Sequence, residues 1–342
     1  MRRVQFVNTA GTAWPWDRQF PSPNGVWKGT QYAFDELKEG QPDWLVVYDG
    51  WPAGSEFHTS VPLQRRILVC AEPESFHRYQ SHFLRQFGHV ITSQSRVKHP
   101  GVIRSQVGIN WFAGVRFNGV AGPHTAVLRF QDFEVSNPPK TKLCSVVCST
   151  KAVTAGHRAR LAFVRQLQAE LGDQVDVYGR GFREIADKDE ALADYRFHIA
   201  LENSVQQDYW TEKLADAYLR GCFPIYVGCP NLDAYFPHAS YDRIDISHPR
   251  RAIARIKEIL ASDMDHHQAA ELAEAKRRVL WEHNIFALLE HVYTQLESSP
   301  QKGVLAPLES PVPLLSDHQA KDFKLSRRIK RMLWNLFGKT GR

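Results

Sequence analysis

Short apolar runs that alternate with helical patterns constrain the fold of this 342-residue chain more than any other feature. Runs that are apolar on both faces suit parallel strands that are covered by helices on both sides. Four runs begin in the first half, at Val4, Trp44, Arg66 and His89, and four in the second half, at Leu143, Val175, Phe197 and Phe223. This alternation predicts an α/β fold with two Rossmann-like domains.

Two segments between the strands of the second half carry clear helix signals. Residues 155–171 place Leu161, Val164, Leu167 and Leu171 on one apolar stripe, which predicts an amphipathic helix. The stretch "TEKLADAYLRG" begins with Thr211 at a suitable N-cap position and ends at Gly221, a residue that commonly stops a helix. A second helix is therefore expected directly after the strand at Phe197.

Composition shifts suggest where the domains end. The stretch "SNPPKTK" at residues 136–142 interrupts the pattern, and a second break runs from residue 298 to 316 with four prolines. We therefore predict an N-terminal Rossmann-like domain over residues 1–138 and a C-terminal one over 139–297. A semi-extended Pro-rich linker should span 298–317, with a basic tail over 318–342.

The positive charge of the chain is concentrated in that tail. Residues 318–342 contain eight Lys or Arg and one Asp, a net charge of +7, whereas the whole chain carries +6. The preceding residues therefore have a net charge near −1. A nucleic-acid-binding protein would normally carry a basic face on its folded body, so this class is disfavoured.

The tail itself has the pattern of a basic amphipathic helix. Its apolar residues are Leu325, Ile329, Met332, Leu333, Leu336 and Phe337, and Arg327, Arg328, Lys330 and Arg331 occupy much of the remaining face. Such a helix suits the surface of an anionic membrane, where each cation contributes about 1 kcal/mol. The alternative is a helix that packs against its own domain or a dimer partner.

Targeting and metal-binding signals are weak. The N-terminus has no apolar core of a signal peptide, and no run is long enough to span a membrane. The five cysteines lie in or beside apolar runs and are expected to be reduced and buried, because Cys144 and Cys148 alone lack the spacing of a zinc site. The single Asp-x-Asp, Asp263 and Asp265, follows no strand and is expected to be a pair of solvated acids at a helix start.

The polar residues between the strands at Phe197 and Phe223 are the strongest functional signal. Glu202 and Asn203 follow the first strand, and ligands in open α/β sheets bind at the carboxyl ends of strands. Lys213 is in the first turn of the expected helix, where the helix dipole disfavours a cation. Its position is reasonable if an anion such as phosphate binds at that helix end. The helix dipole favours the negative charge of Glu212 at this position, and Glu212 could also accept hydrogen bonds from the hydroxyl groups of a ribose.

This region closely resembles the signature of glycosyltransferase family 10, the α1,3/α1,4-fucosyltransferases. Family members carry Tyr-Lys/Arg-Phe, then Phe-Glu-Asn, then Thr-Glu-Lys and a strand of the type Pro-Ile/Val-x-x-Gly. Here these motifs correspond to Tyr195 to Phe197, Leu201 to Asn203, Thr211 to Lys213 and Pro224 to Gly228. The resemblance covers roughly Val175 to Pro237, and the first 140 residues show little of it.

The resemblance implies a GT-B-like fold, in which two Rossmann-like domains face each other across a cleft and the second binds GDP-fucose. Lys213 would contact the diphosphate and Glu212 the ribose, while Asn203 and Tyr209 would line the sugar and phosphate region. Arg180 or Arg183, in "YGRGFR", would supply a second cation. Glu202 and Thr211 belong to the same predicted donor site. Fixed cations are needed because the leaving group is a charged nucleotide diphosphate.

The family transfers fucose with inversion, so a carboxylate should deprotonate the acceptor hydroxyl. In the family this Glu follows a strand of the first domain, in a Glu-Ser-Pro motif. Glu72 holds the nearest position here, in "CAEPES", and Glu74 is the other candidate. A pair of surface carboxylates in a proline turn is the plain alternative. The family needs no dedicated metal site, so Mn²⁺ or Mg²⁺ is expected at most to stimulate.

The resemblance and the tail together predict a bacterial enzyme at the cytoplasmic face of the inner membrane. Its acceptor would be a saccharide or lipid-linked glycan, in lipopolysaccharide biosynthesis or protein glycosylation. Two alternatives remain open at this point. The chain could use another GDP-sugar, or it could be an inactive relative that binds glycans or a membrane surface.

Overall fold

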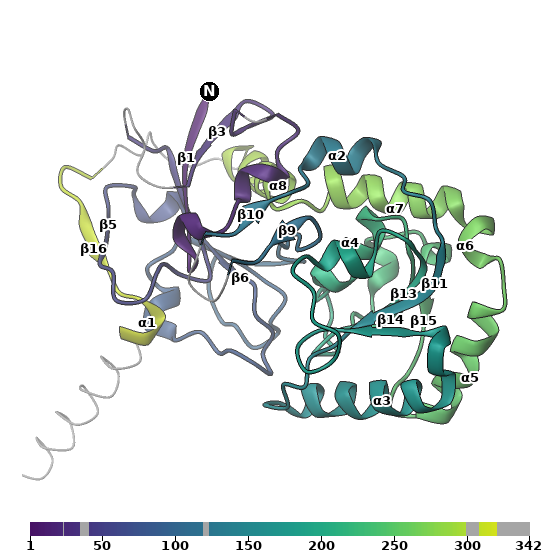
Figure 1. Cartoon of the computed structure of the whole chain (residues 1–342). Helices are drawn as coiled ribbons and strands as arrows, with labels where there is room; N and C mark the ends of the chain where they lie inside the picture. The colour runs from purple at the N-terminus through teal and green to yellow at the C-terminus, as the bar shows by residue number, and fades with distance from the viewer. Residues whose placement is uncertain (23, 35–40, 119–122, 299–307, 320–342) are drawn as a thin grey trace, which may run out of the picture. The chain divides into compact units, whose positions relative to one another are not determined.

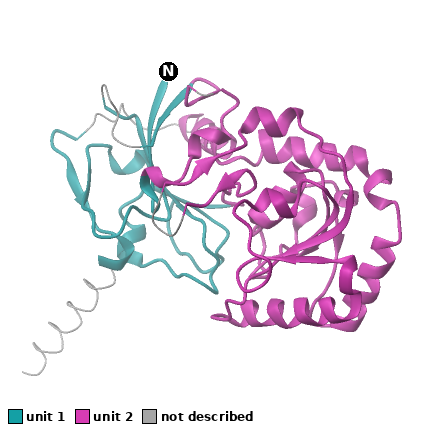
Figure 2. Cartoon of the chain, in the orientation of Figure 1, with its two compact units in different colours: residues 1–11, 30–104, 301–342 teal, residues 12–29, 105–300 magenta. Residues whose placement is uncertain are grey.

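The computed structural model describes residues 1–22, 24–34, 41–118, 123–298 and 308–319. The chain divides into two compact units (Figure 2). Unit 1 comprises Met1–Gly11, Thr30–Arg104 and Gln301–Arg342, and unit 2 comprises Thr12–Gly29 and Ser105–Pro300. Each unit therefore combines segments that are far apart in the sequence.

Unit 1 is built on a parallel sheet. Its strands follow the order β3-β1-β4-β6-β7-β8 (Figure 1). Their bounds are β1 Arg2–Asn8, β3 Thr30–Ala33, β4 Trp44–Tyr48, β6 Arg66–Cys70, β7 His89–Thr92 and β8 Val102–Arg104. A separate antiparallel pair joins β5 Phe57–Thr59 to β16 Val312–Leu314, and the short helix α1 is Ser81–Leu84. Leu45, Leu68 and Phe83 lie in one buried core with Leu314 from the far end of the chain.

Unit 2 contains a second parallel sheet with strand order β12-β11-β13-β14-β15. Its strands are β11 Lys142–Val147, β12 Asp176–Tyr178, β13 Tyr195–Leu201, β14 Phe223–Val227 and β15 Asp242–Arg243. Its helices are α2 Phe130–Val135, α3 Ala155–Leu171, α4 Glu212–Leu219, α5 Pro249–Leu260, α6 Met264–His267, α7 Ala269–Trp281 and α8 Ile285–Ser298. Three further short strands are β2 Val26–Trp27, β9 Val115–Arg116 and β10 Thr125–Ala126.

The predicted secondary structure is confirmed in detail. All eight apolar runs are strands of the two sheets, and the predicted helix at residues 155–171 is α3. All five residues of β4, β6 and β14 are buried, as expected for parallel strands that are covered on both faces. Two parallel sheets in two units confirm the predicted pair of Rossmann-like domains. Their GT-B-like pairing across a cleft stays a prediction.

The division between the units differs from the boundary that we predicted at residue 138. Residues 12–29 and 105–138 belong to unit 2 because their aromatic side chains pack there: Phe20 stacks on Phe286 at 4.0 Å, and Trp27 lies 5.8 Å from Trp281. The prolines at 138 and 139 therefore mark a turn before β11 and not the end of a compact unit. Sequence periodicity does not reveal such packing because the partners are about 270 residues apart in the chain.

The predicted Pro-rich linker contains a strand. Residues 299–307 lie outside the described part of the chain, but β16 follows and pairs with β5 in unit 1. Val312 and Leu314 are two residues apart, and Leu314 is buried. Pro313 occupies a position between them, which masks the alternating pattern of a strand in the sequence. The amphipathic helix predicted for the basic tail falls on residues 320–342 and lies outside the described residues.

All five cysteines are free and buried, as predicted. Trp14, Trp16 and Trp27 are at most 7% exposed and pack in the interior. Of the helices in the described part of the chain, none has the length and apolar character needed to cross a bilayer.

Candidate active site

The predicted donor site lies where β13 leads into α4. β13 ends at Leu201, and residues 202–211 form the loop that connects it to the helix. Thr211 is the N-cap, as predicted, and its side chain accepts a hydrogen bond from the backbone N–H of Lys213 at 3.3 Å. The helix ends at Leu219, just before Gly221, whose φ of 67° lies in the left-handed region that favours glycine. The capping signals in the sequence therefore fix both ends of α4.

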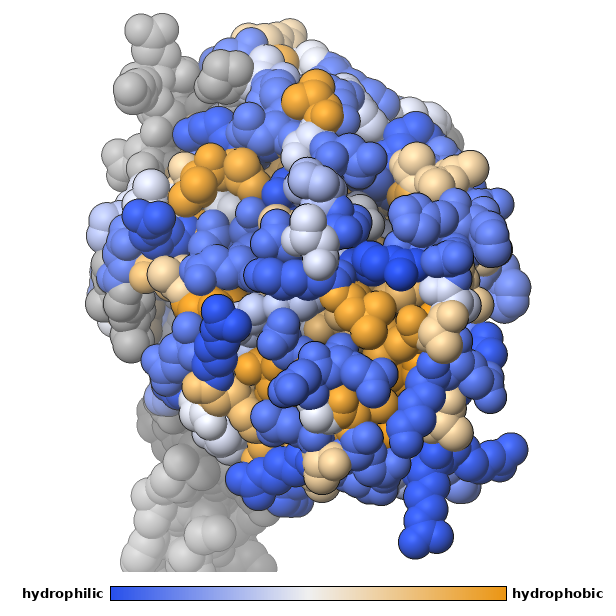
Figure 3. All heavy atoms as spheres, turned by 45° about the vertical axis from the view of Figure 1, so that its right-hand side comes forward, coloured by the Kyte–Doolittle hydropathy of each residue, from blue (hydrophilic) through white to orange (hydrophobic). Residues whose placement is uncertain are grey.

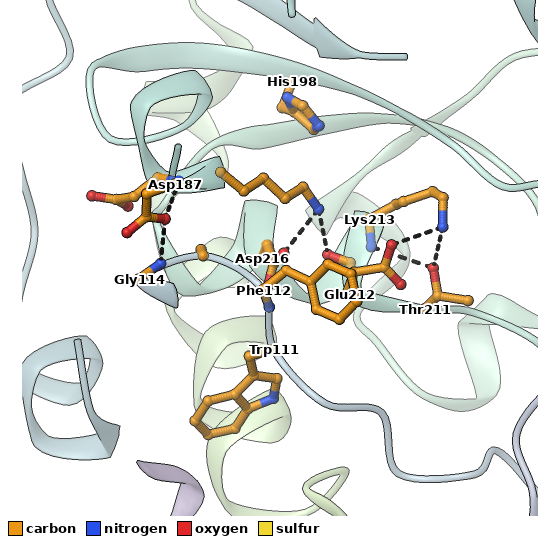
Figure 4. Close-up of polar contacts among 12 residues, drawn as sticks. Trp111, Phe112, Gly114, Asp187, His198, Thr211, Glu212, Lys213 and Asp216 are labelled. Atoms are coloured by element: carbon orange, nitrogen blue, oxygen red, sulfur yellow. Dashed lines mark hydrogen bonds and ion pairs between the residues drawn. The ribbon is translucent and has the colours of Figure 1, made fainter. Parts of the chain in front are cut away.

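Glu202, Thr211, Glu212 and Lys213 form one polar network at this helix start. Figure 4 shows the contacts among Thr211, Glu212 and Lys213. The ammonium group of Lys213 lies 2.9 Å from Glu212 Oε1, 3.0 Å from Thr211 Oγ1 and 3.5 Å from Glu202 Oε2. Thr211 donates its backbone N–H to Glu202 Oε1 at 2.7 Å. The structure thus brings these four residues of the predicted donor site into direct contact, and their role in donor binding stays a prediction.

The network holds one cation between two carboxylates of different exposure. The side chain of Glu202 is completely buried, and burial raises its pKa against the opposing effect of Lys213. Burial would also raise the pKa of Glu212, but the ammonium groups of Lys213 and Lys188 outweigh it and bring the pKa to about 2. Burial opposes the charge of Lys213, yet Glu212 and Glu202 raise its pKa. Lys213 and Glu212 are therefore both charged, and 18% and 15% of their side chains remain accessible.

Glu202 has a different role from the one that the motif suggested. Its carboxylate has no exposed surface and binds the N–H and hydroxyl groups of Thr211. A carboxylate in that position anchors the N-cap and orients Lys213 from below. Within the predicted donor site, Glu202 therefore holds Thr211 and Lys213 in position.

A buried ion pair supports α4 from one turn further along. Lys188 Nζ lies 2.8 Å from Asp216 Oδ2 and donates to the carbonyl of Glu212 at 3.0 Å. Asp216 Oδ1 accepts the backbone N–H of Phe112 at 3.0 Å. The sequence analysis missed both members of the pair. Asp216 within an otherwise apolar helix was a usable signal, because a buried acid needs a partner.

Removing this pair is expected to destabilise unit 2. Asp216→Ala leaves the buried ammonium group of Lys188 without a counter-charge and the N–H of Phe112 without its acceptor, which costs roughly 3–5 kcal/mol. Urea unfolding should show a clearly lower midpoint. Asp194→Ala is the matched control, because Asp194 pairs with Lys142 at 3.3 Å while both side chains are more than 40% exposed. A loss of about 1 kcal/mol or less is expected for it. Equal effects of the two variants would contradict the structural role of Asp216.

The start of α3 packs against the same loop. A Cβ atom at Gly156 would lie 2.0 Å from the carbonyl oxygen of Asn203, so only glycine fits there. Arg160, one turn further, is buried and donates to the carbonyl of Leu201 at 3.0 Å. The amide oxygen of Asn203 is buried and has no hydrogen-bond partner within the described residues. Asn203 therefore lies where the loop after β13 approaches the start of α3 closely. Its side-chain oxygen Oδ1 could still accept a hydrogen bond.

The other predicted donor-site residues lie at the same edge of the sheet or in the same loop. Arg180 and Arg183 follow β12 and are exposed, and the guanidinium group of Arg183 lies 5.0 Å from the ring centre of Tyr178. Tyr209 is only 5% exposed. The residue before it, Asp208, has a φ of 59°, which is uncommon for a residue other than glycine. No direct contact joins these side chains to Lys213 within the described residues, and their roles stay predictions.

The two candidate bases lie just past β6 in unit 1. Glu74 accepts hydrogen bonds from the backbone N–H of Arg96 at 2.6 Å and from Ser95 Oγ at 3.1 Å. Its carboxylate thus holds a neighbouring loop. Glu72 is half-buried, and its carbonyl oxygen accepts a hydrogen bond from Gln94 Nε2 at 2.7 Å. The structure gives the Glu74 carboxylate a structural task, and the choice between Glu72 and Glu74 as the catalytic carboxylate stays a prediction.

A buried acid beside this loop was not found from the sequence. Asp49 follows β4, accepts the backbone N–H of Ala71 at 2.7 Å and makes a short hydrogen bond with the hydroxyl group of Tyr79. Burial raises its pKa, against the opposing hydrogen bond from Tyr79. Asp49 has a φ of 61°, so its backbone is held in an uncommon conformation. The sequence offered only the position of Asp49 at a strand end as a signal.

The Asp-x-Asp has a structural explanation, but not the one that we expected. Arg196 binds Asp263 at 3.0 Å and Asp265 at 2.6 Å, and the side chain of Asp265 is only 6% exposed. Asp265 is therefore a buried partner of an arginine and not a solvated acid. His266 is mostly exposed, as expected. Across the described ranges, no three His, Cys, Asp or Glu side chains are placed to hold a metal ion together.

A cavity of about 600 Å³ lies elsewhere in unit 2. It is lined by the loop before β11, by α7 and by the end of α2, with Val135, Leu272 and Leu280 among its walls. Its amine and indole groups already have partners: Lys276 donates to the carbonyl of Ser136, and Trp281 donates to a Glu134 carboxylate. Figure 3 shows that apolar patches on the visible face are separated by hydrophilic side chains. The cavity lacks the set of polar groups found at the start of α4.

Comparison with known families now adds to this geometry. Residues 137–270 match the sequence profile described as glycosyltransferase family 10 (fucosyltransferase), C-terminal part. This range includes β11 to α6 and the whole polar network around Lys213.

Curated relatives match a similar length of sequence. The chain is 31% identical over 133 residues to 4-galactosyl-N-acetylglucosaminide 3-alpha-L-fucosyltransferase 9 of Homo sapiens, which covers 37% of this chain and 35% of that protein. The match to the Bos taurus protein of the same name is 29% identical with the same coverage. The chain thus spans about a third of the length of the curated relatives that it matches.

Solved structures give longer but weaker matches. The crystal structure of an alpha1,3-fucosyltransferase with GDP is similar with a TM-score of 0.47 and 16% identity, over 88% of this chain and 92% of that one. The same comparison finds an alpha1,3-fucosyltransferase with GDP-fucose at a TM-score of 0.45.

Proposed function

We propose that this chain transfers fucose from GDP-fucose to a hydroxyl group of a saccharide acceptor, because residues 137–270 match the sequence profile of glycosyltransferase family 10. The observation that carries the proposal is the ammonium group of Lys213, which is held at the start of α4 by Glu202 and Glu212 within the matched range. A helix start and a fixed cation together suit a diphosphate.

The leaving group is the first chemical requirement. When the bond between fucose and the diphosphate breaks, negative charge develops on the diphosphate oxygens. Lys213 and the N–H groups at the start of α4 would stabilise that charge, and the Glu202–Thr211 contacts keep Lys213 in position beforehand. Glu212, charged and partly accessible, would accept hydrogen bonds from the ribose. Arg180 or Arg183 would add a second cation.

The acceptor is the second requirement. In the proposed mechanism the carboxylate of Glu72 takes the proton of the acceptor hydroxyl as the oxygen attacks the anomeric carbon of fucose. The attack comes from the face opposite the diphosphate, so the anomeric centre inverts. No step in this mechanism requires a metal ion, and Mn²⁺ or Mg²⁺ would at most stimulate.

An acceptor of the galactosyl-N-acetylglucosamine class is the first to test, because the printed names of the curated relatives specify it. We also propose that the natural acceptor is a bacterial surface glycan, such as lipopolysaccharide, at the cytoplasmic face of the inner membrane. The support is the basic amphipathic pattern of residues 318–342.

The proposal is tested by mixing the full chain with GDP-fucose and N-acetyllactosamine and measuring both GDP release and fucosylated product. GDP-mannose and GDP-glucose serve as competing donors. Faster turnover of another GDP-sugar would reassign the donor. Binding of GDP or of the acceptor with no turnover of any donor would support an inactive relative instead.

The membrane proposal has its own test. Replacing Arg327 and Arg331 with glutamine in the full chain removes two cations, each of which contributes about 1 kcal/mol near an anionic bilayer. Binding to vesicles of phosphatidylglycerol and phosphatidylcholine should weaken roughly 30-fold at low salt. The same change at Arg250 and Arg251 in α5 is the matched control. Equal losses in the two variants would contradict a specific role of the tail.

A further inference from the structure

Residues 308–319 run along unit 1, and we call them the C-terminal strap (Figure 1). Leu308 donates its backbone N–H to the carbonyl of Ser60 at 2.8 Å, and β16 pairs with β5. Leu315 exchanges two hydrogen bonds with the side chain of Gln86, at 2.7 and 2.8 Å. The strap is thus fixed to unit 1 along most of its length by directional bonds.

The strap ends on the loop that carries Glu72. The carboxylate of Asp317 lies 3.1 Å from His77 Nε2 and accepts the backbone N–H of Gln80 at 2.6 Å. Only 16% of the Asp317 side chain is exposed. Asp317 therefore binds one side chain and one backbone group of the same loop, about 240 residues away in the sequence.

The side chain of Gln94 connects Glu72 and His77 within that loop. The side-chain amide of Gln94 donates to the carbonyl of Glu72 at 2.7 Å and to the carbonyl of His77 at 2.9 Å, so a single group spans both ends of the turn. At the base of the loop, the N–H of Ala71 is bound by Asp49 at 2.7 Å. Gln94 thus holds both ends of the turn between Glu72 and His77, and Asp317 holds the His77 end from the strap.

We propose that Asp317 is a positioning residue for the transfer reaction, because it holds the Glu72 loop in place through His77 and Gln80. This inference rests on the proposed function and on Glu72 as the base. The C-terminal strap would then contribute to catalysis as well as lead into the basic tail in the sequence. The membrane-binding segment and the catalytic loop would then meet at one residue.

Electrostatics supports a role for charge at this contact. The hydrogen bond that His77 donates to Asp317 raises the pKa of His77, burial opposes this shift, and the charges of Asp317, Asp49 and Glu72 add to it. The ion pair is therefore complete below the ordinary His pKa of about 6.5 and weakens as the pH rises through the raised value.

The test compares Asp317→Asn with the unmodified full chain. The asparagine keeps an acceptor for the Gln80 N–H but loses the charge that pairs with His77. We expect kcat to fall about 10-fold at pH 6, while KM for GDP-fucose and Kd for GDP stay unchanged. This deficit should shrink as the pH rises towards 9, because His77 of the unmodified chain then loses its charge as well. A purely structural role through Gln80 would give the same ratio at every pH.

Asp43→Asn is the matched control in the same unit. Asp43 also accepts a backbone N–H, from Arg3 at 2.8 Å, and pairs with the Arg3 side chain at 3.9 Å, but it lies at the amino end of β4. It should leave kcat unchanged. Amide exchange at Ala71 and Gln80 provides a readout without activity and should speed up only in Asp317→Asn. Unchanged kcat and exchange in Asp317→Asn would overturn the inference. An unmodified chain with no transfer activity would overturn the proposed function. In that case, unchanged amide exchange in Asp317→Asn would still overturn the inference that Asp317 holds the Glu72 loop in place.

Discussion

Replacing Lys213 with alanine is expected to lower kcat/KM for GDP-fucose by at least about 100- to 1,000-fold, because it removes the cation that would stabilise the departing diphosphate. The effect should also appear in binding: GDP should raise the melting temperature of the unmodified chain and should have little effect on the variant. Product formation and calorimetric GDP titration measure the two effects separately.

The same substitution has a cost in stability that must be separated from the loss of binding. Lys213 lies between Glu202 and Glu212, so its removal leaves two neighbouring carboxylates without their shared cation. Lys213→Met keeps much of the side-chain volume, and both variants should be compared at temperatures where circular dichroism shows them folded. Lys257→Ala is the control, since Lys257 is half exposed and lies 3.7 Å from Glu170. Full GDP binding and turnover in folded Lys213→Ala would refute the proposed donor site.

Glu72→Gln is expected to lower kcat by about 100- to 10,000-fold, the usual contribution of a general base. The substitution preserves the shape of the side chain, and it lies in unit 1, whereas Lys213 lies in unit 2. Affinity for GDP should therefore remain unchanged. Single-turnover transfer to N-acetyllactosamine, together with a GDP titration, distinguishes a chemical defect from a binding defect.

Glu74→Gln decides between the two candidate carboxylates. The amide oxygen that this substitution introduces would still accept the backbone N–H of Arg96, so the loop contact should largely survive and kcat should fall less than 10-fold, a loss of about 1.4 kcal/mol or less. Glu56→Gln, at an exposed position in the same unit, controls for loss of charge alone. If Glu74→Gln loses more activity than Glu72→Gln, the assignment of the base must be reversed.

The sequence predicted what local patterns determine. Periodicity gave the eight strands and α3, and the N-cap at Thr211 followed from its position before an apolar helix. The polar network at α4 could be anticipated because its four residues are at most eleven positions apart, on one strand end and one helix start. A family resemblance over the same residues strengthened that prediction but did not extend to the first 140 residues.

Contacts between distant segments could not be predicted in this way. The partner of Asp216 is 28 residues earlier in the chain, and that of Asp317 is 240 residues earlier. Contacts over 28 or 240 residues produce no periodic residue pattern that a single sequence could reveal. The same limit explains the displaced domain boundary, since residues around Phe20 belong to unit 2 through the stacking of Phe20 on Phe286. Glu202 shows a related limit: its motif position predicted a ligand contact, whereas its complete burial gives it a supporting task.

The interleaving of the two units has a consequence for biosynthesis. Unit 1 begins with the first residue of the chain, but Leu314 of its core and the β16 strand come from the last tenth of the sequence. During translation, all of unit 2 leaves the ribosome before unit 1 can finish its core. The strands of unit 1 that are made early therefore keep part of their apolar surface exposed until the end of synthesis. Premature termination near residue 300 would release a chain in which unit 1 lacks part of its core.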